Sequence, residues 1–599
     1  MHRLGLPLAL LATASWLLAC DDAPEQVDAA EQSPEYVSLR INEIVAKPGS
    51  GNDWVELYNA GSSSVSLDRC HLVDSDPEHQ PQQLPPVLLE PGAFFVIEAV
   101  GSDATPEQLP FKLGATDNLT LSLDGKLHDQ LAWNDGDAPD LAAFGRLPDG
   151  ADNTQTLQPT RSSRNRAWQD PPSLFDQTKV SKVELELYDD GLAQILAEPL
   201  AETYHHGAII YDGYRLDDVQ IRVKGNSSLR TVVQMGSTRF SFKVDLNRTL
   251  PEQTLNGLKK LNFNNQFRDP SLMREFLAYR IAESLGLIVP RRSYVELWVN
   301  GELYGLYLAV EDLDKSFLAQ HFVDNDGQLY KPEPPAGKLS WMGSDYAAYE
   351  ASIGFESRDD EHSALLTLLS ALDAADLALL ERSLDIDAAL GYLAFNTLLV
   401  NLDSYLGPGH NYYLYEQDGR FTILLWDLNE AFGNFTCNCQ RQQLIDLLID
   451  EPTCAPLSEL PLLDVLLAQP AYLERYHALL EAAAQTYLDE TLLESWISEV
   501  FALISPYVRE DPKLLFSFEA FERSIVEDVR DPHQTIIGLL PFARERSLSI
   551  QEQLDGMRPR TADGKGSCKL GWSTKPCGDG VCDERERANP ALCPADCGP

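Results

Sequence analysis

The chain has 599 residues, 44% of them hydrophobic, so it is long enough to form several domains, each with its own buried core. Its 92 acidic and 47 basic residues give a formal net charge of -45. A charge of this size and sign repels DNA, RNA and anionic membrane surfaces, which argues against nucleic-acid binding. A nucleotide would have to meet locally placed Lys or Arg side chains.

The N-terminal residues predict export from the cell. Residues 1–19 combine a short basic start with an apolar run, and Cys20 follows in the sequence LLAC. This stretch resembles a bacterial lipoprotein signal, which implies removal of residues 1–19, a lipid on Cys20 and a protein tethered to a membrane or to the cell surface. An ordinary signal peptide or a buried helix is the alternative. Residues 20–35 are acidic and contain proline, and they are predicted to form a disordered tether.

Residues 36–168 have the pattern of an all-β sandwich. Short alternating runs are separated by Gly, Asn, Asp and Ser turns, and DWVELYN at 53–59 is the most specific of them. The series resembles the lamin-tail domain, which implies an immunoglobulin-like fold. Glu43, Asp53 and Glu56 could form a cation site, but solvated carboxylates at strand ends are the favoured interpretation. No nucleophile and base pair is present in this segment, so we assign it no chemistry.

Residues 401–433, NLDSYLGPGHNYYLYEQDGRFTILLWDLNEAFG, carry the strongest chemical signal. A mostly apolar helix over 385–403 presents Asp403 at its end, and a Gly/Pro loop then leads to a β-hairpin that opens at Asn411 and closes at Asp427. Because these polar residues stand where apolar elements stop, we expect them to converge. Two carboxylates and an amide oxygen are hard ligands of the kind that Mg²⁺ prefers.

The order of several motifs resembles the catalytic core of CotH-type kinases, the spore-coat family of atypical secretory kinases. The motifs are VKGNSS (223–228), SFKVDL (241–246), LKKLNFNN (258–265), RDPSLMREFLAY (268–279), YVELWVNGELYGLYLAVEDLD (294–314), GQLYK (327–331), HNYYLY (410–415) and WDLNEAFG (426–433). The resemblance implies an α+β, two-lobed domain like an atypical protein kinase, which we place at residues 178–556. The last motif often reads WDLD in this family, and Asn429 departs from it.

The resemblance also implies a catalytic role for each polar residue of the hairpin. Asp403 would orient the acceptor hydroxyl, whereas Asp427 and Asn411 would hold Mg²⁺ or Mn²⁺. Lys243 would hold the phosphates of ATP, with help from Lys224.

Further residues are expected to contact the nucleotide. Ser227 follows a Lys-Gly turn that could offer backbone N–H groups to phosphate, although a turn without a ligand fits equally well. Glu275 would pair with Lys243, or alternatively with Arg274 or Arg280 on its own helix, and Arg274 could instead point at phosphate. Glu311 and Asp314 would reach the ribose, beside a backbone site for adenine at 310–312.

The cysteines fit an exported protein. Cys437, Cys439 and Cys454 lie close together without a nearby His, so a disulfide between Cys454 and either of the other two is favoured over a zinc site. Residues 561–599 are predicted to form a small cross-linked tail. Its cysteines are Cys568, Cys577, Cys582, Cys593 and Cys597.

The sequence therefore predicts an extracytoplasmic, lipid-anchored kinase that transfers the γ-phosphoryl group of ATP to a Ser or Thr of a surface or secreted protein. A binding protein for adhesion or coat assembly is the first alternative, because Asn429 departs from the family pattern and ATP has no obvious supply outside the cell. A phosphohydrolase would use the same carboxylates, but none of the eleven His forms a cluster near them.

Overall fold

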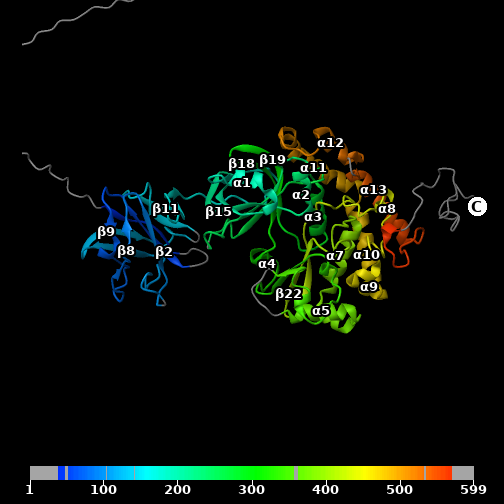
Figure 1. Ribbon diagram of the computed structural model, residues 1–599, viewed down its shortest axis with the longest axis horizontal. Coiled ribbons are helices and arrows are strands. Elements are labelled where there is room, and N and C mark those ends of the chain that lie inside the picture. Colours follow the sequence, from blue (N-terminus) through cyan, green and yellow to red (C-terminus); the bar gives the residue numbers. More distant parts are fainter. Residues whose placement is uncertain are drawn as a thin grey trace, which may run out of the picture. The chain divides into compact units, whose positions relative to one another are not determined.

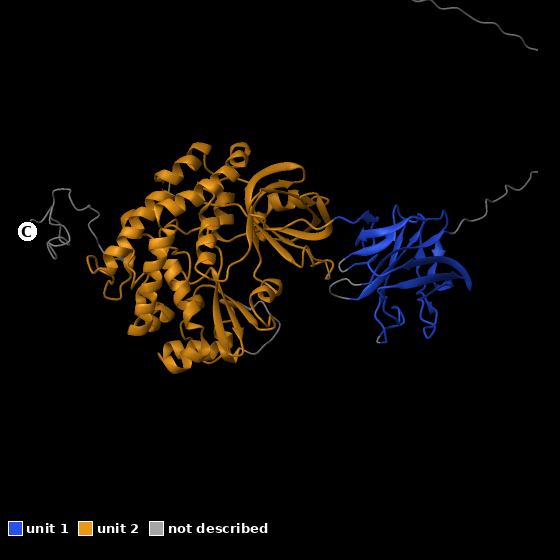
Figure 2. Cartoon of the chain, turned by 180° about the vertical axis from the view of Figure 1, so that it is seen from behind, with its two compact units in different colours: residues 1–169 blue, residues 170–599 orange. Residues whose placement is uncertain are grey.

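The computed structural model describes residues 38–46, 52–102, 104–139, 142–251, 253–355, 362–531 and 534–569. The predicted lipoprotein signal with Cys20, the tether and the four cysteines beyond Cys568 lie outside these residues. The chain divides into two compact units, residues 1–169 and residues 170–599 (Figure 2).

The first unit is a sandwich of antiparallel sheets, as the alternating pattern predicts. One sheet has the order β12–β11–β10–β1–β2–β7, and the other has the order β5–β4–β8–β9. The alternate side chains that point between the sheets form one apolar core. The strands are β1 (Leu39–Val45), β2 (Asp53–Asn59), β4 (Cys70–Val73), β5 (Gln82–Gln83), β7 (Phe94–Ala99), β8 (Asp117–Leu123), β9 (Lys126–Trp133), β10 (Ala143–Arg146), β11 (Thr154–Gln158) and β12 (Arg166–Ala167), with a small pair β3 (Val65–Ser66) and β6 (Leu88–Leu89).

The interpretation of Glu43 and Glu56 as solvated carboxylates is wrong. They face each other across β1 and β2, and both side chains are fully buried. Thr160 donates to Glu43 through its backbone N and its Oγ1, at 2.9 and 2.8 Å, while the backbone N of Ser162 and the amide of Asn42 donate to Glu56. Burial raises the pKa of both carboxyls, that of Glu56 to about 8. A distant loop thus covers a pair that the strand pattern alone leaves exposed.

The second unit begins with a closed seven-stranded barrel in the order β13–β14–β15–β16–β17–β19–β18. The parallel pairing of β13 with β18 closes it, and the other pairs are antiparallel. The interior has its own apolar core. The elements are β13 (Ser181–Leu187), α1 (Gly191–Ala197), β14 (His205–Tyr211), β15 (Tyr214–Lys224), α2 (Ser227–Gln234), β16 (Ser241–Asp245), β17 (Lys260–Asn264), α3 (Arg274–Ser284), β18 (Arg292–Val299) and β19 (Glu302–Glu311).

The rest of the second unit, called the helical part below, surrounds a second core that includes α3 (Figure 1). Its four-stranded sheet has the order β21–β20–β22–β23. The elements are α4 (Lys315–His321), β20 (Gln328–Pro332), β21 (Ile353–Phe355), α5 (Ser363–Asp373), α6 (Leu377–Ser383), α7 (Ile386–Leu398), β22 (Tyr412–Gln417), β23 (Arg420–Leu425), α8 (Arg441–Ile445), α9 (Pro461–Leu467), α10 (Pro470–Tyr487), α11 (Glu490–Glu510), α12 (Phe518–Val526), β24 (Val529–Arg530), β25 (Thr535–Ile536) and α13 (Leu539–Leu554).

Two disulfides follow the candidate site in the chain. Cys437 pairs with Cys454, which confirms one of the two expected partners, and Cys439 pairs with Cys568. The sequence predicts Cys568 in a separate cross-linked tail, but its disulfide joins it to the helical part instead. The side chain of Ser567 donates to the carbonyl of Glu451 at 2.7 Å. The start of the predicted tail therefore packs on the second unit.

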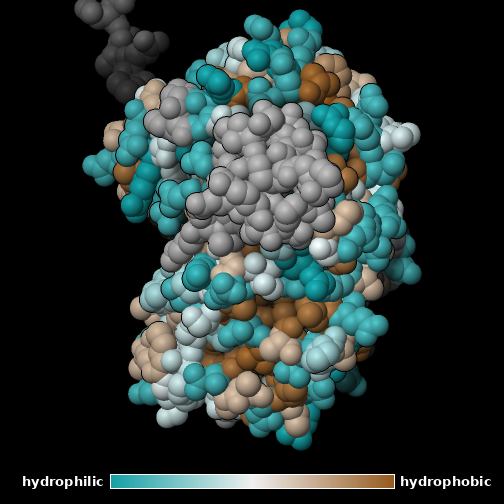
Figure 3. All heavy atoms as spheres, turned by 90° about the vertical axis from the view of Figure 1, so that its right-hand side faces the viewer, coloured by the Kyte–Doolittle hydropathy of each residue, from teal (hydrophilic) through white to brown (hydrophobic). Residues whose placement is uncertain are grey.

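One face of the molecule carries both hydrophilic and hydrophobic residues. Figure 3 shows hydrophobic residues gathered in the lower half of this face, with hydrophilic residues around them. Within the described residues, we find no helix with the length and apolar character needed to cross a membrane.

Candidate active site

The β22–β23 hairpin brings together the three polar residues that the sequence singled out. Tyr412 is paired with Leu425. Asn411, just before β22, and Asp427, just after β23, therefore lie at the same end of the hairpin. Asn411 donates through Nδ2 to the carbonyl oxygen of Asp403 at 2.8 Å and to its Oδ2 at 3.0 Å. The helix α7 ends at Leu398, so Asp403 lies in the turn after the helix and not at its end as expected.

The carboxylate of Asp403 is held on both oxygens. Asn411 binds Oδ2, and Nε2 of His410 lies 2.8 Å from Oδ1. Burial acts to lower the pKa of His410, but the hydrogen bond and the charge of Asp403 outweigh it and raise that pKa. His410 was not predicted as a site residue, although its position directly before Asn411 in HNYYLY was a usable signal.

Asp427 is half-buried and differs from Asp403 in its contacts. Its backbone N donates to the hydroxyl of Tyr279 at 3.0 Å, whereas its carboxylate receives no hydrogen bond from the residues that the structure describes. Burial raises the pKa of Asp427, and the positive charge of Lys224 partly offsets that rise. Asn411 and Asp427 both have left-handed φ angles, 58° and 55°, which cost non-glycine residues free energy and concentrate at functional sites.

A second carboxylate near Asp427 was missed. Glu430, in the same WDLNEAFG motif, is 5% exposed, and its Oε2 has no hydrogen-bond partner among the described residues. Burial raises the pKa of Glu430 to about 8, and the negative charges of Asp403 and Asp427 add to the rise. No signal in a single sequence separated this Glu from an ordinary loop residue.

The donors at this end of the hairpin suit a hard divalent cation. Asp427 offers carboxylate oxygens without hydrogen bonds, and Asn411 offers Oδ1, because its Nδ2 is the atom bound to Asp403. Within the described residues, no three His, Cys, Asp or Glu side chains are arranged to hold a metal alone. Mg²⁺ is commonly bound by one or two carboxylates together with substrate phosphates, so this incomplete set fits a metal that arrives with a nucleotide.

The barrel contributes a half-buried lysine, Lys224, to the same site. Nζ of Lys224 donates to Oδ1 of Asn264 at 3.0 Å and to Oδ1 of Asn262 at 3.2 Å. Burial lowers the pKa of Lys224 to about 8, although the charge of Asp427 opposes this shift. Burial also raises the pKa of Glu275, on α3, to about 7, and the negative charge of Asp427 raises it further. These mutual effects place Lys224, Glu275 and Asp427 in one electrostatic cluster.

The expected ion pair between Lys243 and Glu275 is not formed. Lys243 is ion-paired with Asp312, while Glu275 accepts hydrogen bonds from Asn264 and Gln266. Strand β17 lies between the two groups, because its Asn262 is paired in register with Lys243 and its Asn264 binds Glu275.

Arg274 cannot point at phosphate as expected. Its guanidinium is fully buried and donates to the carbonyls of Ala431, Phe432 and Ile537. It therefore fastens the N-terminus of α3 to the WDLNEAFG motif. The alternative partner for Glu275 on the helix surface, Arg280, instead binds Glu499 at 3.0 Å.

Three other predicted contacts are not gathered at the cluster. Glu311 is buried and binds Arg291 through two hydrogen bonds, at 2.9 and 2.6 Å. Asp314 caps α4 by accepting from two backbone N–H groups. Ser227 is exposed at the first turn of α2. Glu311 and Asp314 thus have structural partners already, and the VKGNSS turn leads directly into α2.

The family models match both units of the chain. The model described as CotH kinase protein matches residues 221–547, which is more than half of the chain, and the Lamin Tail Domain model matches residues 32–141. The chain belongs to the CotH kinase protein family. Its matched region contains Lys224, Asp403 and Asp427.

Two curated relatives come from Bacillus subtilis strain 168. The chain is 24% identical over 288 residues to "Inner spore coat protein H", covering 45% of this chain and 75% of the relative. It is 39% identical over 61 residues to "Inner spore coat protein H-like protein", covering 10% and 20%. Among solved structures, a Shewanella oneidensis MR-1 complex of HipA, HipB and operator DNA matches 61% of this chain and 80% of that chain, with 14% identity. Its TM-score of 0.26 is too low to establish a shared fold.

Proposed function

We propose that this protein is an ATP-dependent protein kinase that transfers the γ-phosphoryl group to a Ser or Thr hydroxyl of a surface or secreted protein. The observation that carries the proposal is the contrast between two aspartates at one end of the hairpin. Asp403 is oriented on both carboxylate oxygens, whereas the nearby Asp427 carboxylate receives no hydrogen bond from the described residues. One is suited to orient a substrate and the other to bind a cation.

The roles follow from these contacts, because phosphoryl transfer depends on positioning and charge neutralisation. Asp427 and Asn411 would hold Mg²⁺ or Mn²⁺, which neutralises phosphate charge when bound. Lys224 and Lys243 provide cations from the barrel. Asp403, fixed by His410 and Asn411, accepts a hydrogen bond from the acceptor hydroxyl and directs its oxygen at the γ-phosphorus. The new P–O bond forms as the bond to the leaving ADP oxygen breaks, and Asp403 receives the hydroxyl proton.

The proposed location is outside the cytoplasm, with the lipid on Cys20 as a membrane tether. The name of the Bacillus relative, an inner spore coat protein, supports a surface or coat location for this chain as well. The two disulfides of the present chain support a location in an oxidising compartment.

Substitution of the two aspartates tests the proposal. A ligand at about 100 times its Kd stabilises the folded state by roughly 2.7 kcal/mol, which is measurable as a shift in Tm. We expect Asp427→Ala to lose both the Mg·ATP-dependent shift and the activity, and Asp403→Asn to keep most of the shift but lose the activity. Asp418→Asn, at the hairpin turn, is the matched control and should keep both.

Labelled ATP separates the alternatives. Transfer to protein supports a kinase, release of phosphate alone supports a hydrolase, and the absence of both supports a binding protein for coat assembly or adhesion. A full Mg·ATP shift in Asp427→Ala, or no shift in the unaltered protein, would show that the hairpin is not a nucleotide and metal site.

A further inference from the structure

Within the part of the chain that the structure describes, Asn264 links the buried carboxylate of Glu275 to a lysine by hydrogen bonds. The amide of Asn264 is used at both ends: Nδ2 donates to the two oxygens of Glu275, at 2.9 and 3.1 Å, and Oδ1 accepts from Lys224 at 3.0 Å. Asn262 accepts a second hydrogen bond from Lys224. Residues two apart on a strand point to the same face, so Asn262 and Asn264 form one platform for the lysine on β17.

Lys224 is placed to act on a ligand of the hairpin. It is the last residue of β15, and its Nζ lies 5.5 Å from the centre of the Trp426 ring. Asp427 follows Trp426 in the sequence, and among the neighbouring cations Lys224 lowers the pKa of Asp427 most. Lys243 is placed differently, because it is ion-paired with Asp312, whose side chain is 7% exposed. To reach a phosphate, Lys243 would have to break its ion pair with the buried carboxylate of Asp312, which is costly.

We infer that Lys224, and not Lys243, is the principal protein cation that contacts the nucleotide phosphates. Asn264, itself bound to Glu275, holds the Lys224 ammonium group in position. This inference rests on the proposed function and assigns the lysine of that site. Glu275, Asn264 and Lys224 are thus connected in series by hydrogen bonds. This series replaces the direct Lys–Glu ion pair that the sequence suggested.

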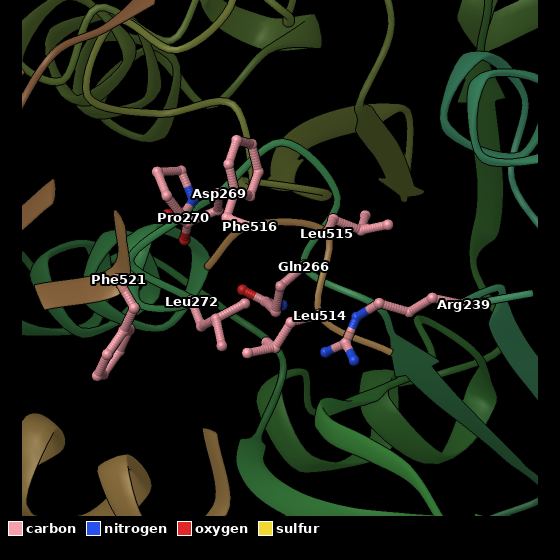
Figure 4. A pocket seen from close by; sticks show the side chains of 9 residues that line it. All are labelled: Arg239, Gln266, Asp269, Pro270, Leu272, Leu514, Leu515, Phe516 and Phe521. Carbon is pink, nitrogen blue, oxygen red and sulfur yellow. The ribbon is translucent and has the colours of Figure 1, made fainter. Parts of the chain in front are cut away.

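The carboxylate of Glu275, at the other end of this series of hydrogen bonds, is also held in place. Gln266 donates through Nε2 to Glu275 at 3.0 Å and has a left-handed φ of 55°. It lines the small cavity in Figure 4 together with Arg239 of the barrel and Leu514 of the helical part. Glu275 is thereby held by two amides and fully buried, so the position of Asn264 is determined from both sides.

The affinity of the full chain for Mg·ATP tests the assignment. From the usual strength of hydrogen bonds to charged groups, we expect Lys224→Met to weaken binding on the order of 10–100-fold and Lys243→Met to weaken it by less than about 5-fold. Lys182→Met is the matched control, since Lys182 is an exposed lysine on strand β13 of the same barrel, and it should leave the Kd unchanged.

Asn264→Leu distinguishes positioning from a structural role. If Asn264 acts through Lys224, its effect on the Kd is expected to vanish in the Lys224→Met background, because coupled residues are not additive. If it only supports the fold, the two losses multiply. A Lys243→Met effect larger than that of Lys224→Met, or multiplying losses for Lys224 and Asn264, would overturn the inference.

A measurement on the unaltered protein tests the same assignment without depending on whether the variants fold. Lysine acetylation followed by mass spectrometry, with and without Mg·ATP, should show protection of Lys224 that exceeds the protection of Lys243. Greater protection of Lys243 would refute the assignment while leaving the proposed function intact. Failure of the unaltered chain to bind Mg·ATP would instead refute the proposed function.

Discussion

Replacing Asp511 by alanine is expected to destabilise the second unit strongly, because it leaves Arg239 as an unpaired charge in the interior. Nη1 of Arg239 lies 2.6 Å from Oδ2 of Asp511, and the two side chains are 1% and 0% exposed. Arg239 also donates to the carbonyls of Asn265, Tyr304 and Leu306. The pair therefore joins the end of α11 to the barrel, and it is embedded in backbone contacts on both sides.

The magnitude follows from the burial. Removing one partner of a buried ion pair costs about 3–5 kcal/mol, whereas an exposed pair contributes about 0–1 kcal/mol. In domains of about 150–250 residues, 1 kcal/mol moves the Tm by roughly 2–4 °C, and the shift is smaller in larger domains. For the second unit we therefore expect the Tm of Asp511→Ala to fall on the order of 5 °C. Asp511 also accepts from the backbone N of Leu306 at 2.9 Å, and loss of that bond adds to the effect.

Calorimetric melting of the full chain measures the effect. Asp326→Ala is the control, because Asp326 pairs with Lys315 at 2.9 Å in an exposed position, with side chains 78% and 60% exposed. The double variant Arg239→Met with Asp511→Leu should regain much of the lost stability, since no unpaired charge remains. If Asp511→Ala melts within about 1 °C of the unaltered protein, the pair does not join α11 to the barrel as we describe.

Two further predictions concern pH and redox state. The carboxyl of Glu56 has an ordinary pKa of 4.5 and a pKa of about 8 when folded, so the folded state holds a proton that the unfolded state releases between these values. The free energy of unfolding of the first unit should therefore fall as the pH rises from about 5 to about 8, and Glu56→Gln should flatten that slope in calorimetric melts, whereas an unchanged slope would contradict the assignment. Cys568→Ser opens a disulfide that spans 129 residues, so it should lower the stability of the second unit by about 2–4 kcal/mol, and an unchanged Tm would show that Cys439–Cys568 adds nothing to the folded state.

The sequence could predict elements whose pattern is local. The hairpin turn at Asp418–Gly419 and the turn at Asn300–Gly301 are both present, because Asn-Gly and Asp-Gly favour the backbone of a tight hairpin. The helix after Asp269 is also present, but it starts at Arg274 instead of directly after the Asp-Pro-Ser signal. The N-cap of this helix is Met273, but the carboxylate of Asp269 accepts from the backbone N of Arg274 at 2.8 Å, so the predicted start signal does contact the first turn.

Partners that depend on the tertiary fold could not be predicted. Lys243 and Glu275 are plausible partners by charge, yet strand order gives them Asp312 and Asn264 instead. Cys439 finds its partner 129 residues away, and no local spacing contains that information. The site residues that lie on the β22–β23 hairpin could be predicted from the sequence. The partners of the site residues that the barrel contributes could not.

Contacts from α3 hold the backbone of Asp427 in a strained conformation without any ligand. Asp427, Phe432 and Gly433 all have positive φ, so the WDLNEAFG motif is strained at two non-glycine positions, each of which costs about 1–3 kcal/mol. Such a conformation persists only where the surroundings determine it. Tyr279 accepts from the backbone N of Asp427, and Arg274 donates to the carbonyl of Phe432 at 3.1 Å. Both residues belong to α3, the helix that also carries Glu275. A single helix therefore holds the strained motif that bears Asp427 and supplies the carboxylate that positions Lys224 through Asn264, so a shift of α3 would displace both charges of the site together.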